Sequence, residues 1–296
     1  MDDRDFWILA RLRKDPFSSY ETLGRGIGLS GNAAKSRIES LEKTGVLTSL
    51  RAMPAAQVFR RIPRLVFFRQ SLASLEKFQA VLEIGPAVFA TMDVNGKVGV
   101  VLYDNPSSPK PSEQLTNLLG PIEAEVTPLL PYPHRELSKP LTLADLKVLR
   151  ALVHNLRVPL REISQTTGLS QKVAKKTRRK LIEGGLFQVQ PIFQSAQSSR
   201  ILMYEVHVYS SDNSILTRIK EILPKSVFLN QWEEGAFIFS GWASSMSEVS
   251  ETEKKLRSER GVTDVLLKFH SRAVLASSKL ISWLDGEIAR VQEARN

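Results

Sequence analysis

The sequence predicts an α+β protein made of two winged helix-turn-helix units and two ferredoxin-like βαββαβ units. Two observations lead to this fold class. The N-terminal pattern recurs 140 residues later, and each copy passes from short segments of helical periodicity into segments of strand periodicity. Because a repeated order of elements indicates repeated domains, we expect the 296 residues to form several modules of ordinary size.

The repeat is ungapped over its first part. With a shift of 140 positions, residues 5–45 align with residues 145–185, and ten pairs are identical. These pairs are Asp5/Asp145, Leu9/Leu149, Leu12/Leu152, Gly28/Gly168, Leu29/Leu169, Ser30/Ser170, Ala34/Ala174, Lys35/Lys175, Leu41/Leu181 and Gly45/Gly185. We therefore expect a tandem duplication within the chain.

Each copy predicts three helices with a tight turn before the third. The turn is Gly-Leu-Ser at 28–30 and again at 168–170, and its serine is a typical N-cap for the third helix. Gly45 and Gly185 follow the third helices as typical C′ residues. This order is a helix-turn-helix, whose last helix enters the major groove of DNA.

The rest of each copy predicts the order βαββαβ. The expected elements of the first copy are strands at 65–69, 87–92, 97–103 and 123–127 and helices at 72–82 and 112–119. Those of the second copy are strands at 202–209, 226–231, 236–241 and 263–269 and helices at 214–222 and 245–260. Asn95-Gly96 is a strong hairpin signal between two strands. The order indicates an antiparallel sheet with two helices on one face.

These elements set the expected domain boundaries. They are 1–50 for the first helix-turn-helix, 51–64 for a wing or connector, 65–128 for the first ferredoxin-like domain, 129–140 for a linker, 141–190 for the second helix-turn-helix, 191–271 for the second ferredoxin-like domain and 272–296 for a C-terminal helix. Residues 51–64 carry Arg51, Arg60, Arg61 and Arg64, so this segment is either a wing on the DNA backbone or a basic connector.

Composition and charge narrow the class of protein. The absence of cysteine excludes disulfides, thiolate metal sites and cysteine nucleophiles. No apolar run reaches membrane-spanning length and the acidic start is unlike a signal peptide, so we expect a soluble, cytoplasmic protein. Residues 141–190 contain ten Lys or Arg and three Asp or Glu, which is most of the net charge of +10. Charge focused in one block is typical of a surface that binds phosphates.

The third helices are the expected DNA-binding elements. Six of the ten residues at 171–180 are Lys or Arg and none is acidic, whereas Glu39 and Glu42 dilute the charge of the first copy. The expected DNA-binding residues are Ser30, Asn32, Lys35, Ser36, Arg37, Ser170, Gln171, Lys172, Lys175, Lys176, Arg178 and Arg179. Asn32 and Arg37 are chemically able to read base edges, whereas the lysines of the second copy should contact phosphates first.

The chain resembles the Lrp/AsnC family of transcription regulators. The resemblance is carried by Asp5 to Leu9, by Gly28-Leu29-Ser30, and by the run from Arg37-Ile38 through Leu41 to Gly45-Val46. It implies double-stranded DNA as the partner, transcription regulation as the function, and a family dimer fused into one chain, an intramolecular pseudo-dimer. The two heads would then face half-sites about one helical turn apart. An architectural or partner-binding protein is an alternative.

Two departures from the family pattern change what we expect. The segments that match the family's effector loop, 91–96 and 230–235, lack its Gly-rich pattern, so the sequence argues against an amino-acid effector and names no other small molecule. Arg178 stands at the position of apolar Ile38, and its stem should cover the core while the guanidinium reaches a phosphate.

The sequence favours a protein that is not an enzyme, with no cofactor, no metal and no catalytic residue. Gly26-x-Gly28-x-x-Gly31 matches a dinucleotide fingerprint by letters, but it follows no strand. An enzyme alternative remains, because siroheme decarboxylases combine the same units and use histidines near a tetrapyrrole. His207, which shares a strand face with Glu205, and His270 are the candidates; Phe67 matches His207 in the first copy.

The C-terminal helix has an apolar stripe. It consists of Leu280, Trp283, Leu284, Ile288 and Val291. The stripe either covers the chain's own sheets or joins another protomer, and we expect a homo-oligomer of the fused unit.

Overall fold

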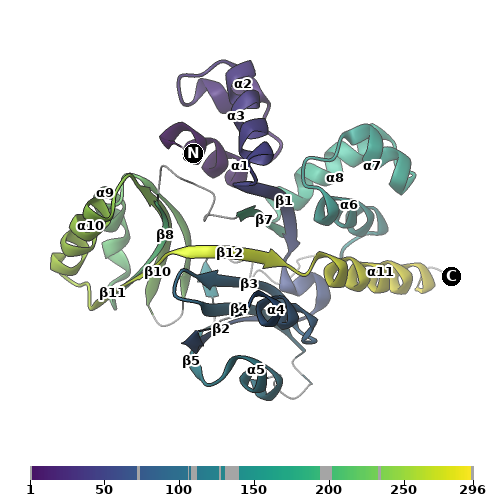
Figure 1. The fold of residues 1–296 in the computed structure, drawn as a ribbon. Helices are drawn as coiled ribbons and strands as arrows, with labels where there is room; N and C mark the ends of the chain where they lie inside the picture. Colours follow the sequence, from purple (N-terminus) through teal and green to yellow (C-terminus); the bar gives the residue numbers. More distant parts are fainter. Residues whose placement is uncertain are drawn as a thin grey trace.

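The computed structural model describes residues 2–71, 74–105, 107, 112–126, 128–130, 140–193, 202–232 and 235–294. They form two winged helix-turn-helix units and two five-stranded antiparallel sheets, which confirms the predicted α+β fold class (Figure 1). The same order of elements occurs in both halves. The origin of these halves by duplication stays a prediction.

The two helix-turn-helix units have matching elements. The first contains α1 (Asp3–Lys14), α2 (Tyr20–Arg25), α3 (Gly31–Lys43) and β1 (Leu47–Pro54). The second contains α6 (Leu143–His154), α7 (Leu160–Thr167), α8 (Gln171–Glu183) and β7 (Phe187–Phe193). Their boundaries follow the predicted caps, since the hydroxyls of Ser30 and Ser170 accept the backbone N–H groups of Ala33 and Val173 at 3.2 and 3.3 Å.

The two units are joined directly to each other. Strands β1 and β7 pair antiparallel, with Ala52 opposite Val189. The buried residues of both units form one apolar cluster that includes Leu12, Leu152 and Phe187. The two heads are therefore held together by a shared core and ribbon, in addition to the sheets below them (Figure 1).

The segment 51–64 binds back onto the protein. Its arginines contact Ser277 (Arg51, 3.0 Å), Glu287 (Arg60, 2.9 Å), the carbonyl of Tyr103 (Arg61, 3.0 Å) and Asp104 (Arg64). A 3₁₀ helix, η1 (Ala56–Phe59), lies inside this segment. Residues 51–54 are the end of β1 and residues 62–64 the start of β2, so only 55–61 connect two strands, and all four arginines contact the protein itself.

The first sheet has the strand order β12-β3-β4-β2-β5 and the second the order β11-β8-β10-β9-β6. The first half supplies β2 (Ile62–Ser71), β3 (Ala87–Asp93), β4 (Lys97–Asp104), β5 (Ile122–Val126) and β6 (Pro128–Leu130), with helices α4 (Leu75–Ala80), η2 (Val81–Glu83) and α5 (Ser112–Leu119). The second half supplies β8 (Leu202–Tyr209), β9 (Ser226–Trp232), β10 (Ala236–Ala243), β11 (Asp264–Lys268) and β12 (His270–Leu275), with η4 (Asn213–Ile215), α9 (Leu216–Ile222), α10 (Met246–Ser258) and α11 (Ser277–Glu293).

The halves exchange one strand each. Strand β6 follows the first sheet but pairs with β9 of the second, and β12 follows the second sheet but pairs with β3 of the first. Two sequence-based expectations are corrected here, because residues 129–130 of the expected linker and 272–275 of the expected C-terminal helix are in strands. Residues 131–139 of that linker, with His134, lie outside the described residues.

The two sheets face each other. Helices pack on one face of each sheet, where Phe78 and Leu115 are buried in the first and Ile219 and Leu256 in the second. Between the opposite faces lies a small apolar cluster of Ala236, Ile238, Leu65, Phe67, Tyr209 and Leu229. Polar residues on these inner faces are therefore partly enclosed.

The apolar stripe of α11 covers the chain itself. Leu280 and Leu284 are fully buried in the cluster shared by the helix-turn-helix units, and the ring of Trp283 lies 5.3 Å from the ring of Phe59. Arg150 of α6 donates to Asp285 at 2.6 Å. The stripe therefore packs on the helix-turn-helix core. The sequence had left two alternatives, the chain's own sheets or another protomer.

Candidate active site between the two sheets

A cluster of titratable side chains lies on the inner face of the second sheet. Glu205 and His207 are two residues apart on β8, so both side chains point to the same face. Lys268 of β11 is directly opposite Glu205 in the antiparallel register, and Leu266 is opposite His207. Three polar groups thus meet at one position between the sheets.

His270 joins this cluster because the chain crosses from one sheet to the other. The backbone N–H of Val94 donates to the carbonyl of Phe269 at 2.8 Å, which starts the pairing of β12 with the first sheet. His270 Nε2 then lies 3.3 Å from Glu205 Oε2. Glu205 is therefore placed between two imidazoles, His207 on its own strand and His270 on the crossing strand.

Phe67 of the first sheet closes the cluster. Its ring lies 6.1 Å from the ring of His207, and the Lys268 ammonium lies 3.1 Å from the ring centroid. Gly99, the partner of Phe67 in β4, leaves room for this ring, because an added Cβ would come 3.0 Å from it. The ammonium is therefore held by a cation–π contact.

Burial and opposite charges set the protonation states. Burial would raise the pKa of Glu205, but the charges and hydrogen bonds of His270 and His207 hold that pKa well below its usual range. Burial lowers the pKa of His207, against the opposite effect of Glu205. An ionised Glu205 therefore accepts a hydrogen bond from Nε2–H of His207.

Lys268 is the cation of this site. Burial lowers its pKa to about 8, against the opposite effect of Glu205. Within the described part of the chain, no carboxylate lies within ion-pairing distance of its ammonium. The group is charged at neutral pH and is available to an anionic ligand.

A pocket of about 350 Å³ opens beside the cluster. Its walls include Phe67, Lys97, Glu123, Leu266, Lys268 and His270. Thr91, Asp93 and Asn95 also line it, so the first of the two segments at the family's effector loop does border a pocket. In the second, Glu233 and Glu234 lie outside the described residues.

Among the residues that the structure describes, no group of three or more His, Asp or Glu side chains is arranged so that it could hold a metal ion. No helix in the same ranges is long and apolar enough to cross a membrane.

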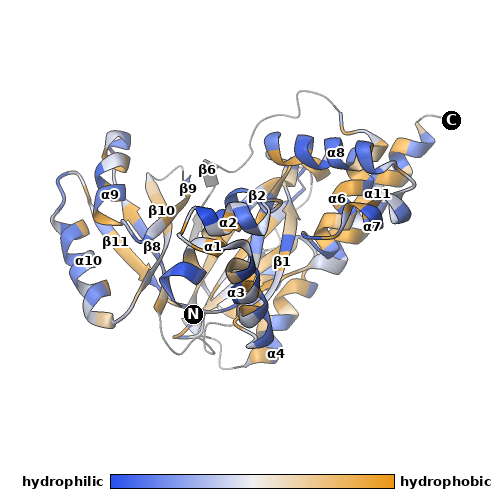
Figure 2. Cartoon of the chain, turned by 90° about the horizontal axis from the view of Figure 1, so that it is seen from above, coloured by the Kyte–Doolittle hydropathy of each residue, from blue (hydrophilic) through white to orange (hydrophobic). Residues whose placement is uncertain are grey.

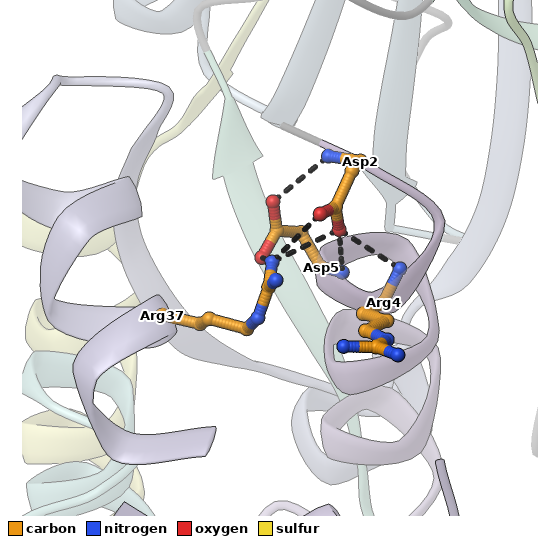
Figure 3. A network of polar contacts seen from close by, with 4 residues as sticks. All are labelled: Asp2, Arg4, Asp5 and Arg37. Atoms are coloured by element: carbon orange, nitrogen blue, oxygen red, sulfur yellow. Dashed lines mark hydrogen bonds and ion pairs between the residues drawn. The ribbon is translucent and has the colours of Figure 1, made fainter. Parts of the chain in front are cut away.

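The third helix of the first unit, α3, uses its arginine inside the unit. Arg37 Nη1 lies 2.9 Å from an oxygen of Asp2 and 2.9 Å from one of Asp5, at the N-terminus of α1 (Figure 3). Asp2 and Asp5 also form the capping box of that helix. Asn32, Lys35 and Ser36 are exposed, so of the predicted base readers only Asn32 is directed to solvent without such a contact.

The second recognition helix α8 keeps an exposed basic face. Gln171, Lys172, Lys175, Lys176 and Arg179 are exposed, and Figure 2 shows the helix as largely hydrophilic on the surface of its unit. Arg178 is half-buried with its guanidinium 4.0 Å from the ring of Phe17. The guanidinium therefore contacts the first unit, where the sequence predicted that it would reach a phosphate.

Sequence reasoning missed Lys268 and the way in which His270 enters the site. Lys268 and His270 are two residues apart, a spacing that places side chains on one face of a strand. That alternation was the available signal. The expected strand at 263–269 contains Lys268 and is followed directly by His270, but only the histidine was considered as a site residue.

The similarity to known proteins is uneven along the chain. A family model described as winged helix-turn-helix DNA-binding matches residues 1–48. No curated protein matches the chain. Two solved structures of the siroheme decarboxylase NirDL cover 98% of this chain and 100% of their own, at 13% identity, with TM-scores of 0.54 and, for a co-complex with an iron-uroporphyrin III analogue, 0.51. The fold is similar to that of NirDL over nearly its whole length.

Transcription regulators match a smaller part. An AsnC family regulator from Agrobacterium tumefaciens covers 44% of this chain and 89% of its own, at 16% identity and a TM-score of 0.32. The expectation that the chain is not an enzyme is wrong, because the proteins matched over its full length are enzymes. The expectation rested on the absence of a nucleophile–base pair or metal cluster, which proton-transfer chemistry does not need.

Proposed function

We propose that this protein is an enzyme that removes carboxyl groups from an iron tetrapyrrole bound in the pocket between the sheets. The observation that carries the proposal is the cluster of Glu205, His207, His270 and Lys268 on the wall of that pocket. Buried titratable groups with shifted pKa values are common at functional sites. The full-length similarity to a siroheme decarboxylase supports the same assignment.

The residues match the chemistry of the proposed substrate. Such a tetrapyrrole presents a flat apolar ring and several carboxylates. Phe67 and Leu266 offer apolar walls to the ring, and the Lys268 ammonium offers an ion pair to a carboxylate. Of the two lysines that line the pocket among the described residues, only Lys268 is free to pair with a substrate carboxylate, because the ammonium of Lys97 lies 3.2 Å from Glu123.

Decarboxylation breaks the bond between the side-chain carbon and the carboxylate. The electron pair left on that carbon must take up a proton, so the site needs a proton donor close to the leaving carboxylate. His270 lines the pocket and is the candidate donor. Glu205 accepts a hydrogen bond from His207 and lies beside His270, so Glu205 and His207 are positioning residues that orient the imidazole of His270.

The test is a titration of the purified protein with sirohaem, followed by mass spectrometry of the extracted tetrapyrrole. We expect a shift of the absorbance bands on binding and a product lighter by one or more carbon dioxide units. An unchanged spectrum and an unchanged mass would rule the proposal out.

A second candidate function is DNA binding, as in an Lrp/AsnC-type regulator. It is favoured by the exposed cations of α8, because Lys172, Lys175, Lys176 and Arg179 have no acidic partner among the described residues. Replacement of Lys175, Lys176 and Arg179 by Ala should lower affinity for all DNA sequences and flatten its dependence on salt. Unchanged gel shifts would remove this candidate.

A further inference from the structure

The side of α8 and the first helix-turn-helix unit enclose a cleft of about 480 Å³. Phe17 of the first unit and Arg178 of the second both line it. The guanidinium of Arg178 lies 4.0 Å from the ring of Phe17, and that of Arg157 lies 4.7 Å from the ring of Tyr20. The Arg178–Phe17 contact links α8 to the loop between α1 and α2, and the Arg157–Tyr20 contact links the loop between α6 and α7 to the start of α2.

The cleft carries an excess of positive charge. Lys14, Lys175, Arg178 and Arg179 line it, against Asp15 and Glu183. Asp15 is used by its own turn, since its carboxylate accepts the backbone N–H of Phe17 at 3.1 Å and the hydroxyl of Ser18 at 2.7 Å. In the described ranges of the chain, none of the four cations has an ion pair with a carboxylate.

Two guanidinium groups at the junction of the two units are partly buried: Arg178 in the cleft, and Arg157 outside the cleft lining. Burial lowers the pKa of Arg178, only partly offset by the charge of Asp15. Nη1 of Arg157 is buried, and no described residue accepts a hydrogen bond from it. Burying a cation is unfavourable, and an anion bound in the cleft would offset that cost for Arg178.

We propose that the cleft binds backbone phosphates of duplex DNA, with Lys14 of the first unit and Lys175 and Arg179 of the second on the same stretch of backbone. The inference rests on the proposed binding of DNA by α8. Lys175 and Arg179 belong both to the exposed face of α8 and to the cleft, so a strand that follows this face passes Lys14.

This arrangement differs from two heads on separate half-sites. The β1–β7 ribbon and the shared core hold the two units at a fixed distance. The first unit then contacts the same DNA site as the second instead of binding a site of its own. This agrees with Arg37 of α3, whose guanidinium binds Asp5 within the first unit. The helix-turn-helix pair forms one composite surface.

Because the chain has no cysteine, single-cysteine variants of the full-length protein can carry a DNA-cleaving iron chelate. We expect Lys14→Cys and Lys175→Cys to cut one duplex within about half a helical turn, about 5 base pairs, of each other. Lys254→Cys, exposed on α10, serves as the control and should not cut. If the variant at position 175 cuts DNA but the variant at position 14 does not, or if their cutting sites lie a full helical turn apart, the proposed composite surface is wrong. DNA binding by α8 would still stand.

A second measurement separates the remaining outcomes. Lys14→Ala should reduce the slope of log affinity against log salt by about 0.9, the value for one lost phosphate contact, while Lys254→Ala should leave it unchanged. Thermal unfolding with and without pyrophosphate tests whether the cleft binds a small anion instead. If pyrophosphate stabilises the wild type but not Lys14→Ala, and Lys14→Ala leaves the salt dependence of DNA affinity unchanged, the cleft binds a small anion and the proposal fails. If the wild-type protein binds no DNA, both the inference and the DNA-binding function fail.

Discussion

The ring of Phe67 lies 6.1 Å from the ring of His207, the residue that occupies its equivalent position in the second half. The same comparison pairs Leu65 with Glu205. One half therefore presents an apolar pair where the other presents a partly buried acid and a buried base. The site is asymmetric although it lies between two similar sheets.

This asymmetry predicts a stability effect. Replacing Glu205 by Leu and His207 by Phe together copies the first half, and buried ion pairs are often no better for stability than apolar residues. The double variant should equal or exceed the wild type in free energy of unfolding, by up to about 4 kcal/mol. His207→Phe alone should lower it by about 1–3 kcal/mol, because Glu205 loses its hydrogen bond. Urea unfolding measures the free energy of unfolding of both variants. A double variant that is less stable than His207→Phe alone would contradict this prediction.

Lys268 predicts a pH dependence of ligand binding. Its pKa of about 8, lowered by burial, means that the ammonium is present below this pH and lost above it. Affinity for a carboxylated porphyrin should fall as the pH rises through about 8. Lys268→Met should bind weakly at every pH, and Lys268→Arg should keep its affinity at higher pH. Fluorescence titration with the porphyrin from neutral to alkaline pH measures the affinity of the three proteins. If the affinity of Lys268→Met falls with pH as that of the wild type does, another group causes the pH dependence.

Arg37 predicts a loss of stability. Because its guanidinium binds Asp2 and Asp5, Arg37→Ala should lower the free energy of unfolding by about 1–2 kcal/mol. Lys35→Ala is the matched control, since Lys35 has only an exposed pair with Glu39 at 3.6 Å and should change stability by at most about 0.5 kcal/mol. Thermal unfolding distinguishes the two variants, and equal effects would show that the network contributes nothing.

Lys279 predicts a larger effect. Its ammonium donates to the carbonyls of Leu82, Ile84 and Ala87 at 2.5, 2.7 and 3.0 Å, which ties the start of α11 to the first sheet. Lys279→Met leaves these acceptors without that donor and should cost about 2–4 kcal/mol. Lys77→Met, at an exposed position of α4, is the control. Equal unfolding midpoints in urea would show that the three hydrogen bonds are not stabilising.

The local parts of the fold could be predicted from the sequence, because their signals are local. The caps Ser30 and Ser170 and the glycines Gly45 and Gly185, whose φ values are 71° and 61°, are determined by a few neighbouring residues. Strand β12 is different, since its pairing with β3 joins residues far apart in the chain. The residues of β12 precede the amphipathic helix α11 directly, and nothing in their pattern indicates that they pair with β3.

The candidate site was half predictable for the same reason. Glu205 and His207 share a face at a spacing that the sequence displays. The meeting of Lys268 with Phe67, and of His270 with Glu205, depends on strand register and on the crossing between sheets. Neither is encoded by a spacing within one element.

The most direct test of the proposed enzyme compares the wild type with the double variant Glu205→Leu, His207→Phe under single-turnover conditions with sirohaem. Lys268 and His270 remain in the variant, so it should still shift the absorbance of the bound tetrapyrrole. We predict that the wild type yields a product lighter by carbon dioxide and that the variant forms it at least about 100-fold more slowly. Equal rates of product formation by the two proteins would contradict the account.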